Sequence, residues 1–512
     1  MGIHESVTVT RFAAIAVAVV ALAVFVLGGP LRSPQAFARA NAIDFNAAYC
    51  GVSVAERGAD PYRVEPLRGC EHEVTPTRSH DRDWIVVPAP LPGYTFFLLR
   101  PFAHVPYDVA KMLWVAFGVL ALLVASLCAA RVTNLPAIAV LLVFAPSIGL
   151  LNLWYGEPVP LAIAFLGVAA LAAHERRDAL AGVFAALALL EPHVGLPACV
   201  GAFIALPRSR AALTGTLAVL ALLSLAALGP RLNLEYVLQA LPAQARSEIA
   251  VNYQLSFAHV LSLAGVPTRA AVTLGSLSYA ATTLLGSAIA FRLVERGYRA
   301  AAISLPVTCA MLGGPYVHTV EIAAAIPGAL LLCTILEGRA RLAAALGLAI
   351  LVIPWNPGAI ANVANVPLAL AAVFVATALA LERTGAPLRA AALVTLALGL
   401  YVAAIPPGTS APPPQPARPE AIHPDDLSSR AWTMFVLSSP VWPHEDVEHV
   451  MLKAPQWGAL LLTIGAALTL IPVRFPSRPP QPIGEPASIP AGARRRLSAT
   501  SPDTLASGKE AL

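Results

Sequence analysis

A long series of apolar runs, separated by short turns that contain Arg, constrains this chain more than any other feature. An α-helix rises about 1.5 Å per residue, so a run of about 20 apolar residues can cross the hydrocarbon core of a bilayer. The chain is 57% hydrophobic and 12% charged, whereas soluble domains carry about 25% charged residues. We therefore predict an all-α polytopic membrane protein. Its expected spans, about twelve in number, lie near residues 10–30, 107–130, 133–153, 157–174, 210–229, 270–293, 299–315, 319–337, 341–356, 364–381, 388–406 and 456–474.

The distribution of Arg predicts the topology. With the N-terminus inside, alternate turns carry Arg and the opposing turns carry none, apart from three long loops, as the positive-inside rule requires. The net charge of +5 is thus topological, and we expect no nucleic-acid partner. The run 10–30 has no convincing cleavage site and is interpreted as an uncleaved signal anchor.

The long loops define the expected domain organisation. Residues 1–474 are predicted to form one transmembrane domain, with a large first extracytoplasmic loop at 32–106 and further outer loops at 230–269 and 407–455. The tail 475–512 is rich in Pro, Ser and Ala, and we expect it to be disordered and cytoplasmic. Cys50 and Cys70 both fall in the first loop, where either a disulfide or two free thiols is compatible with the sequence.

The run 179–206 departs from the pattern, because Glu191-Pro192-His193 interrupts it. Each half has only about 13 residues, too few to cross the membrane. A re-entrant hairpin, or a broken pair of short tilted helices, fits both the length and the charges. Irregular backbone at membrane depth persists only where it is buried or lines a wet cavity. The run therefore predicts a polar cavity on the outer side.

Ionisable residues beside membrane spans are costly and usually functional. The outer-face set comprises Asp44, Asp60, Arg63, Arg100, Asp108, Lys111, Glu157, Glu191, His193, Arg246, Glu248, Asn252, His318 and Glu321. The sequence has no P-loop, no dinucleotide-binding glycine motif, no zinc-type Cys/His spacing and no nucleophile elbow. We accordingly predict no cofactor and no metal.

Four motifs, in order, carry a resemblance to a known family. They are Asp44-Phe45-Asn46-Ala47-Ala48-Tyr49 with Gly58-Ala59-Asp60-Pro61-Tyr62; the Pro-rich stretch from Ala89-Pro90-Leu91-Pro92 to Leu113-Trp114; Gly156-Glu157 with Ala181-Gly182 and Glu191-Pro192; and Pro315-Tyr316-Val317-His318. Over most of residues 10–340 the chain resembles glycosyltransferase family 87, within the GT-C class of membrane glycosyltransferases. The family usually has Gln where Glu157 stands and Lys where Glu191 stands, so both positions depart from its pattern.

The resemblance implies a GT-C fold and transfer of a sugar from a polyprenyl-phosphate donor to a lipid or glycan acceptor. Mannose is the donor sugar best known in the family, whose members act on the extracytoplasmic side of a bacterial plasma membrane. It implies that Asp44 is the general base of an inverting transfer, with His318 able to pair with it. The remaining candidates for binding the donor phosphate or substrate are Arg100, Arg246, Tyr62, Glu157, Glu191 and His193.

Three other functions remain open at this stage. A lipid-linked glycan polymerase or ligase of GT-C type would use a second lipid-linked glycan as acceptor. A lipid or glycolipid flippase would need polar residues along a path through the bilayer, whereas here the inner halves of the spans are almost uniformly apolar. An inactive relative is compatible with the two acidic departures.

Overall fold

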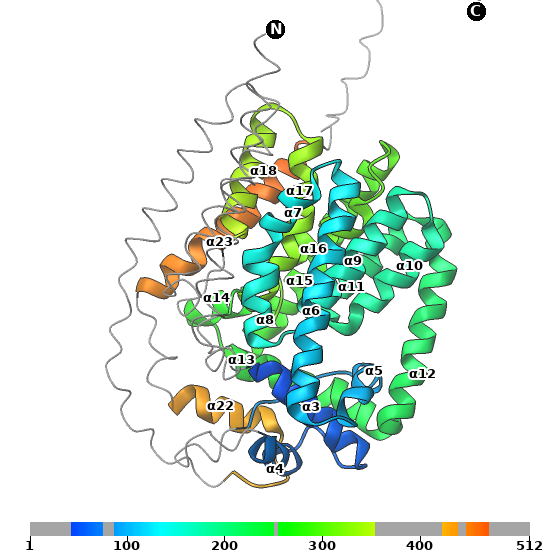
Figure 1. Ribbon diagram of the computed structural model, residues 1–512. Helices are drawn as coiled ribbons and strands as arrows, with labels where there is room; N and C mark the ends of the chain where they lie inside the picture. The colour runs from blue at the N-terminus through cyan, green and yellow to red at the C-terminus, as the bar shows by residue number, and fades with distance from the viewer. Residues whose placement is uncertain (1–41, 75–85, 250–253, 354–421, 439–446, 471–512) are drawn as a thin grey trace, which may run out of the picture. The chain divides into compact units, whose positions relative to one another are not determined.

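The computed structural model describes residues 42–74, 86–249, 254–353, 422–438 and 447–470. These residues fall within one compact unit, Met1–Ile471. Across the described ranges the regular secondary structure is helical, and the sole β-type pairings are two isolated bridges (Figure 1). The predicted spans 10–30, 364–381 and 388–406, and the predicted tail 475–512, lie outside the described residues.

The helices that follow the predicted apolar runs are α6 (Tyr107–Thr133), α7 (Ala137–Phe144), α8 (Asn152–Tyr155), α9 (Val159–His174), α10 (Asp178–Leu187), α11 (Pro192–Ala205), α12 (Arg210–Glu235), α15 (Thr268–Glu295), α16 (Ala301–Ala310), α17 (Ile326–Ile335), α18 (Gly338–Leu351) and α23 (Val447–Leu468). Within the described residues, three segments are long and apolar enough to cross a membrane: Tyr107–Thr133, Pro207–Glu248 and Thr268–Glu295. The chain is thus a helical membrane protein, whereas the predicted number of about twelve spans is not established.

The long helix α6 has the two faces expected of a lipid-facing helix. Its outer face exposes large apolar side chains, among them Met112, Leu120 and Leu127. Its inner face buries small residues such as Ala121 and Ala125, and packs against α9. Small residues at such contacts let helix backbones approach closely, which is how helices associate in lipid.

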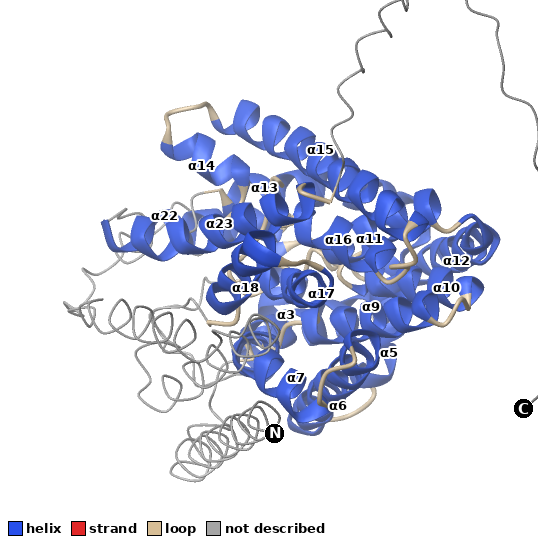
Figure 2. Cartoon of the chain, turned by 90° about the horizontal axis from the view of Figure 1, so that it is seen from above, coloured by secondary structure: helices blue, strands red, loops and turns tan. Residues whose placement is uncertain are grey.

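Helix α16 lies at the centre of the bundle, and all ten of its residues are buried. It packs against α15, α11, α9 and α17, and the view from above shows α11 and α16 between α15 and α9 (Figure 2). The broken run predicted at 179–206 is a pair of short helices, α10 and α11. The extended backbone of Glu191 separates them (φ −117°, ψ 96°).

A second group of helices comes from the predicted outer loops, and four of them, α3, α4, α5 and α22, lie at the lower end of the unit in Figure 1. These are α3 (Ile43–Glu56), α4 (Val64–Val74), α5 (Gly93–Ala103), α13 (Leu241–Glu248), α14 (Phe257–Leu263) and α22 (Ser428–Ser438). Helix α3 packs on α4 and α5, α22 contacts α4 and α13, and α5 contacts α12. A disulfide joins Cys50 of α3 to Cys70 of α4, with 5.6 Å between the Cα atoms.

The chain turns sharply at Gly229, whose φ of 67° and ψ of 173° interrupt α12. A side chain would disfavour this left-handed φ, and Pro230 follows directly. The predicted span 210–229 therefore ends at this kink. The helical segment that follows continues through Tyr236–Ala240 into α13 and carries Glu248 toward the bundle.

Candidate active site

His318 lies in the turn between α16 and α17, where contacts on both sides hold its backbone. Its N–H donates to Oε2 of Glu321 at 2.7 Å. The N–H of Val317 donates to Oε1 of Gln254 at 3.0 Å, and the N–H of Leu255 donates to the carbonyl of Val317 at 2.7 Å. Gln254 and His318 thereby form an isolated antiparallel bridge, which fixes the position of the imidazole.

Two carboxylates flank the His318 ring. Nε2 lies 3.1 Å from Oε2 of Glu248, and Nδ1 lies 3.5 Å from Oε1 of Glu321. Gln244 orients Glu248 by donating from Nε2 to its Oε1 at 2.6 Å. Burial disfavours the imidazolium, but the charges and hydrogen bonds of Glu321 and Glu248 outweigh it and raise the pKa of His318 well above its usual value. His318 is therefore a fixed positive charge at neutral pH.

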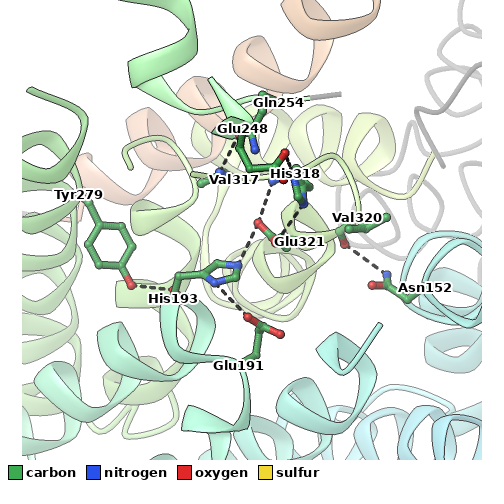
Figure 3. A network of polar contacts seen from close by, with 10 residues as sticks. All are labelled: Asn152, Glu191, His193, Glu248, Gln254, Tyr279, Val317, His318, Val320 and Glu321. Atoms are coloured by element: carbon green, nitrogen blue, oxygen red, sulfur yellow. Dashed lines mark hydrogen bonds and ion pairs between the residues drawn. The ribbon is translucent and has the colours of Figure 1, made fainter. Parts of the chain in front are cut away.

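Glu321 also reaches His193, so one carboxylate links two histidines (Figure 3). Nε2 of His193 lies 2.9 Å from Oε2 of Glu321, and Nδ1 lies 3.0 Å from Oε1 of Glu191. Glu191 precedes the first turn of α11, which places its carboxylate beside His193. The hydroxyl of Tyr279 donates to the backbone carbonyl of His193 at 2.6 Å. The break predicted from sequence thus contributes two charged side chains to this network.

The turn after α8 packs against the start of α3. Gly156 ends α8 with a left-handed φ of 76°, and a Cβ there would lie 2.8 Å from Cβ of Phe45 and 2.9 Å from Cβ of Ala42. Nε1 of Trp114 donates to the Gly156 carbonyl at 2.8 Å. The Trp114 ring stacks on Phe45 with 5.2 Å between centroids. Glycine is therefore required here for close approach as well as for φ.

This packing brings Glu157, which follows Gly156, close to Asp44, which precedes Phe45. Asp44 interacts electrostatically with Glu157, His318, Glu248 and Glu321. Burial raises the pKa of Asp44 to about 7, with His318 acting in the opposite direction. Burial and the neighbouring Asp44 raise the pKa of Glu157 well above its usual value. Asp44 keeps part of its surface accessible.

Tyr62, predicted to bind substrate, lies in an apolar core instead. Its side chain is 2% exposed, its hydroxyl donates to the carbonyl of Leu91 at 2.9 Å, and its ring stacks on Tyr236 with 5.7 Å between centroids. The preceding Asp60 accepts a hydrogen bond from the Tyr62 N–H at 2.9 Å. These contacts give the Gly-Ala-Asp-Pro-Tyr motif a structural explanation.

The two arginines predicted to bind the donor phosphate lie outside this network. Nε of Arg100 donates to a carboxylate oxygen of Glu56 at 2.8 Å, at the surface. Arg246 is exposed on α13. It stands two residues before the buried Glu248, and residues two apart in an α-helix point to opposite sides. The structure therefore brings Asp44, Glu157, Glu191, His193 and His318 together, and neither arginine with them.

Glu248 and Glu321 belong to the outer-face set of ionisable residues, but the sequence did not predict a catalytic or binding role for either. The sequence signal for Glu321 is its position three residues after His318 near the start of a helix, where its carboxylate caps the His318 backbone N–H. Glu248 stands 70 residues before His318, and no local pattern connects the two. Among the described residues, no group of three or more His, Cys, Asp or Glu is arranged to hold a metal ion.

Comparison with known proteins gives one family match. The model of glycosyltransferase family 87 matches residues 92–317. The resemblance to this family predicted from the sequence is thereby confirmed over residues 92–317. The matched region runs from just before α5 to Val317 and includes the turn that carries Glu157 and the α10–α11 break. No curated protein and no solved structure matches the chain.

Proposed function

We propose that this protein transfers a sugar, with mannose as the expected donor sugar, from a polyprenyl-phosphate carrier to a lipid or glycan acceptor. The reaction takes place on the extracytoplasmic face of a bacterial plasma membrane, with inversion at the anomeric carbon. The observation that carries this proposal is that Asp44, from the first outer loop, lies against a network of two histidines and three glutamates supplied by distant helices. A partly accessible carboxylate beside fixed imidazolium groups suits base-assisted glycosyl transfer.

In this reaction the acceptor hydroxyl oxygen attacks the anomeric carbon while the bond from that carbon to the phosphate oxygen breaks. Asp44 takes the hydroxyl proton, and the bond electrons leave with polyprenyl phosphate. One in-line step of this kind inverts the anomeric centre and forms no covalent enzyme intermediate. His318 interacts with Asp44, and its positive charge keeps a fraction of Asp44 ionised despite its burial.

The leaving phosphate needs positive charge or hydrogen-bond donors. His193 is the group we assign to it. Its two ring nitrogens lie 3.0 Å from Oε1 of Glu191 and 2.9 Å from Oε2 of Glu321. Glu191 and Glu321 favour the charged form of the ring, which suits it to stabilise a leaving phosphate.

The test is transfer by purified protein in lipid, with polyprenyl-phosphate-mannose and a membrane-lipid extract of the host. Wild type, Asp44→Asn and Asp108→Asn are compared. Asp108 is exposed in the first turn of α6 and serves as the matched control. We expect product from wild type and from Asp108→Asn, and a loss of about 10²–10⁴-fold in the folded Asp44→Asn variant.

Equal product from wild type and Asp44→Asn would remove Asp44 as base. Product formed only with a second lipid-linked glycan as acceptor would indicate a polymerase or ligase. Suppose that no lipid-linked sugar is transferred, but that labelled lipid moves between the two leaflets of vesicles that contain the protein. The glycosyltransferase proposal then fails, and a flippase function replaces it.

A further inference from the structure

Two side chains of α23, Lys453 and Trp457, connect this helix to the candidate active site. They stand four residues apart, so they lie on the same face of the helix. Lys453 is 9% exposed, and Trp457 is partly buried. Lysine is rarely buried in a protein unless its ammonium group is paired, and an ionisable residue in an apolar helix of a membrane protein usually has a function. The contacts of Lys453 therefore need an explanation.

Lys453 reaches the backbone beside Glu248 through His259 of α14. Nζ of Lys453 is hydrogen bonded to Nε2 of His259, and Nδ1 of the same ring lies 2.6 Å from the carbonyl oxygen of Ile249. A carbonyl oxygen only accepts, so Nδ1 carries a proton, and an ammonium group only donates, so Nε2 accepts from Lys453. The imidazole is thus a neutral bridge. Ile249 follows Glu248 directly, so this first arm holds the end of α13.

Trp457 reaches the backbone beside His318 through Leu255. Nε1 of Trp457 donates to the carbonyl of Leu255 at 2.9 Å, and the N–H of Leu255 donates to the carbonyl of Val317 at 2.7 Å. The Trp457 ring stacks on Phe257 with 6.3 Å between centroids. Val317 precedes His318 directly, so this second arm holds the turn that carries the imidazole of His318.

The two arms end on either side of one contact, in which Oε2 of Glu248 lies 3.1 Å from Nε2 of His318 (Figure 3). We propose that Lys453 and Trp457 are positioning residues that hold Glu248 against His318, and that α23 is therefore part of the catalytic unit. The inference rests on the proposed function, because His318 is the charge beside the base of that reaction. It extends the catalytic unit beyond residues 92–317, which the family model matches.

The arms act on one end of the network only. The hydrogen bond from Tyr279 and the carboxylate of Glu191 hold His193, the group assigned to the leaving phosphate. Loss of either arm lets Glu248 and His318 separate but leaves these two contacts in place. We therefore expect it to slow the chemical step without weakening the binding of the donor.

Lys453→Met and Trp457→Phe test the inference through kcat and KM. Met has no donor, and Phe keeps an aromatic ring without the N–H. We expect kcat to fall between about 10-fold and 10²-fold in each variant, with the KM for polyprenyl-phosphate-mannose unchanged. Rates are referred to folded protein, measured by unfolding in the same lipid preparation, so a merely structural loss leaves kcat at the wild-type value. Arg269→Met removes an exposed charge in the first turn of α15 and is expected to match wild type.

A double variant tests the path of the first arm. If Lys453 acts through His259, adding Lys453→Met to His259→Leu lowers kcat no further, because the bridge is already lost. A full additional loss would overturn this path. Wild-type kcat in both Lys453→Met and Trp457→Phe would overturn the inference as a whole. A higher KM with unchanged kcat would also overturn it, since α23 would then bind the donor rather than position the pair.

A readout independent of transfer separates this inference from the proposed function. Solid-state nitrogen NMR of protein labelled at histidine reports the hydrogen bonding of His318, whose signal is the one that His318→Gln removes. We expect this signal to shift in Lys453→Met and in Trp457→Phe and to stay in place in Arg269→Met. An unmoved signal in the first two variants would refute the positioning role. If wild type transfers no sugar but the signal shifts as expected, the proposed function fails and the positioning role stands.

Discussion

Gly156→Ala tests whether the turn after α8 positions the base. The added Cβ would lie 2.8 Å from Cβ of Phe45 and 2.9 Å from Cβ of Ala42. Neither atom can rotate away, because both are attached directly to the backbone of α3 or its first cap. Relief therefore requires the start of α3, and Asp44 with it, to move away from Glu157.

The expected loss in the free energy of unfolding has two parts. A non-glycine residue at a φ of 76° costs roughly 1 kcal/mol or slightly more. Overpacking of a rigid contact adds about 1–3 kcal/mol. Gly58→Ala is the matched control, since Gly58 has a φ of 73° and nothing within 4 Å of its added Cβ. The difference in destabilisation between the two variants, about 1–3 kcal/mol, isolates the contact with α3.

The assays are unfolding of both variants in the same lipid preparation and initial rates of glycosyl transfer. A displacement of a catalytic group by about 1 Å costs about 10²-fold in rate, so we expect a loss of that order in Gly156→Ala and little loss in Gly58→Ala. The reasoning is wrong if the two variants unfold alike and transfer sugar at the same rate.

Three further outcomes are expected. Replacing both Cys50 and Cys70 by Ser opens a covalent loop with a sequence separation of 20 residues and should lower the free energy of unfolding by about 3 kcal/mol; equal stability of wild type with and without reductant would contradict this. Tyr279→Phe removes the hydrogen bond to the His193 carbonyl and should cost about 1 kcal/mol of stability, measured by denaturant unfolding against wild type. His193→Gln should raise the KM for the lipid-linked donor more than it lowers kcat; if Arg246→Gln shows that effect instead, the phosphate lies on the outer face of α13.

The apolar runs predict the helices well because the length of an apolar run is a local property. The runs 107–130 and 270–293 correspond to α6 and α15 within a few residues at either end. The helix break at Glu191 follows equally from a charged residue before Pro192 inside an apolar run. Each of these signals is contained in one stretch of sequence.

The candidate site is less predictable, because it depends on distances between segments. The sequence predicts Asp44 and His318 on the same side of the membrane, and the two residues lie close enough to interact electrostatically. The sequence alone could not place Glu248 against His318, because that contact depends on the turn at Gly229 and on the helical path that follows it. Likewise Arg246 has the expected charge on the expected side, but helical periodicity turns it away from Glu248.

The order of charges across the network suits the inverting transfer that we propose. Asp44 and Glu157 form an acidic end that can take a proton, and His193 forms a positive end that can face a phosphate. Glu321 and His318 stand between them, and Glu321 contacts both rings. Because the proposed reaction removes a proton from the attacking oxygen and builds negative charge on the leaving oxygen, we expect the sugar to lie between the two ends. Glu321 then has to be a carboxylate: an amide at this position would weaken the charge of both histidines at once, and with it both the ionisation of Asp44 and the stabilisation of the leaving phosphate.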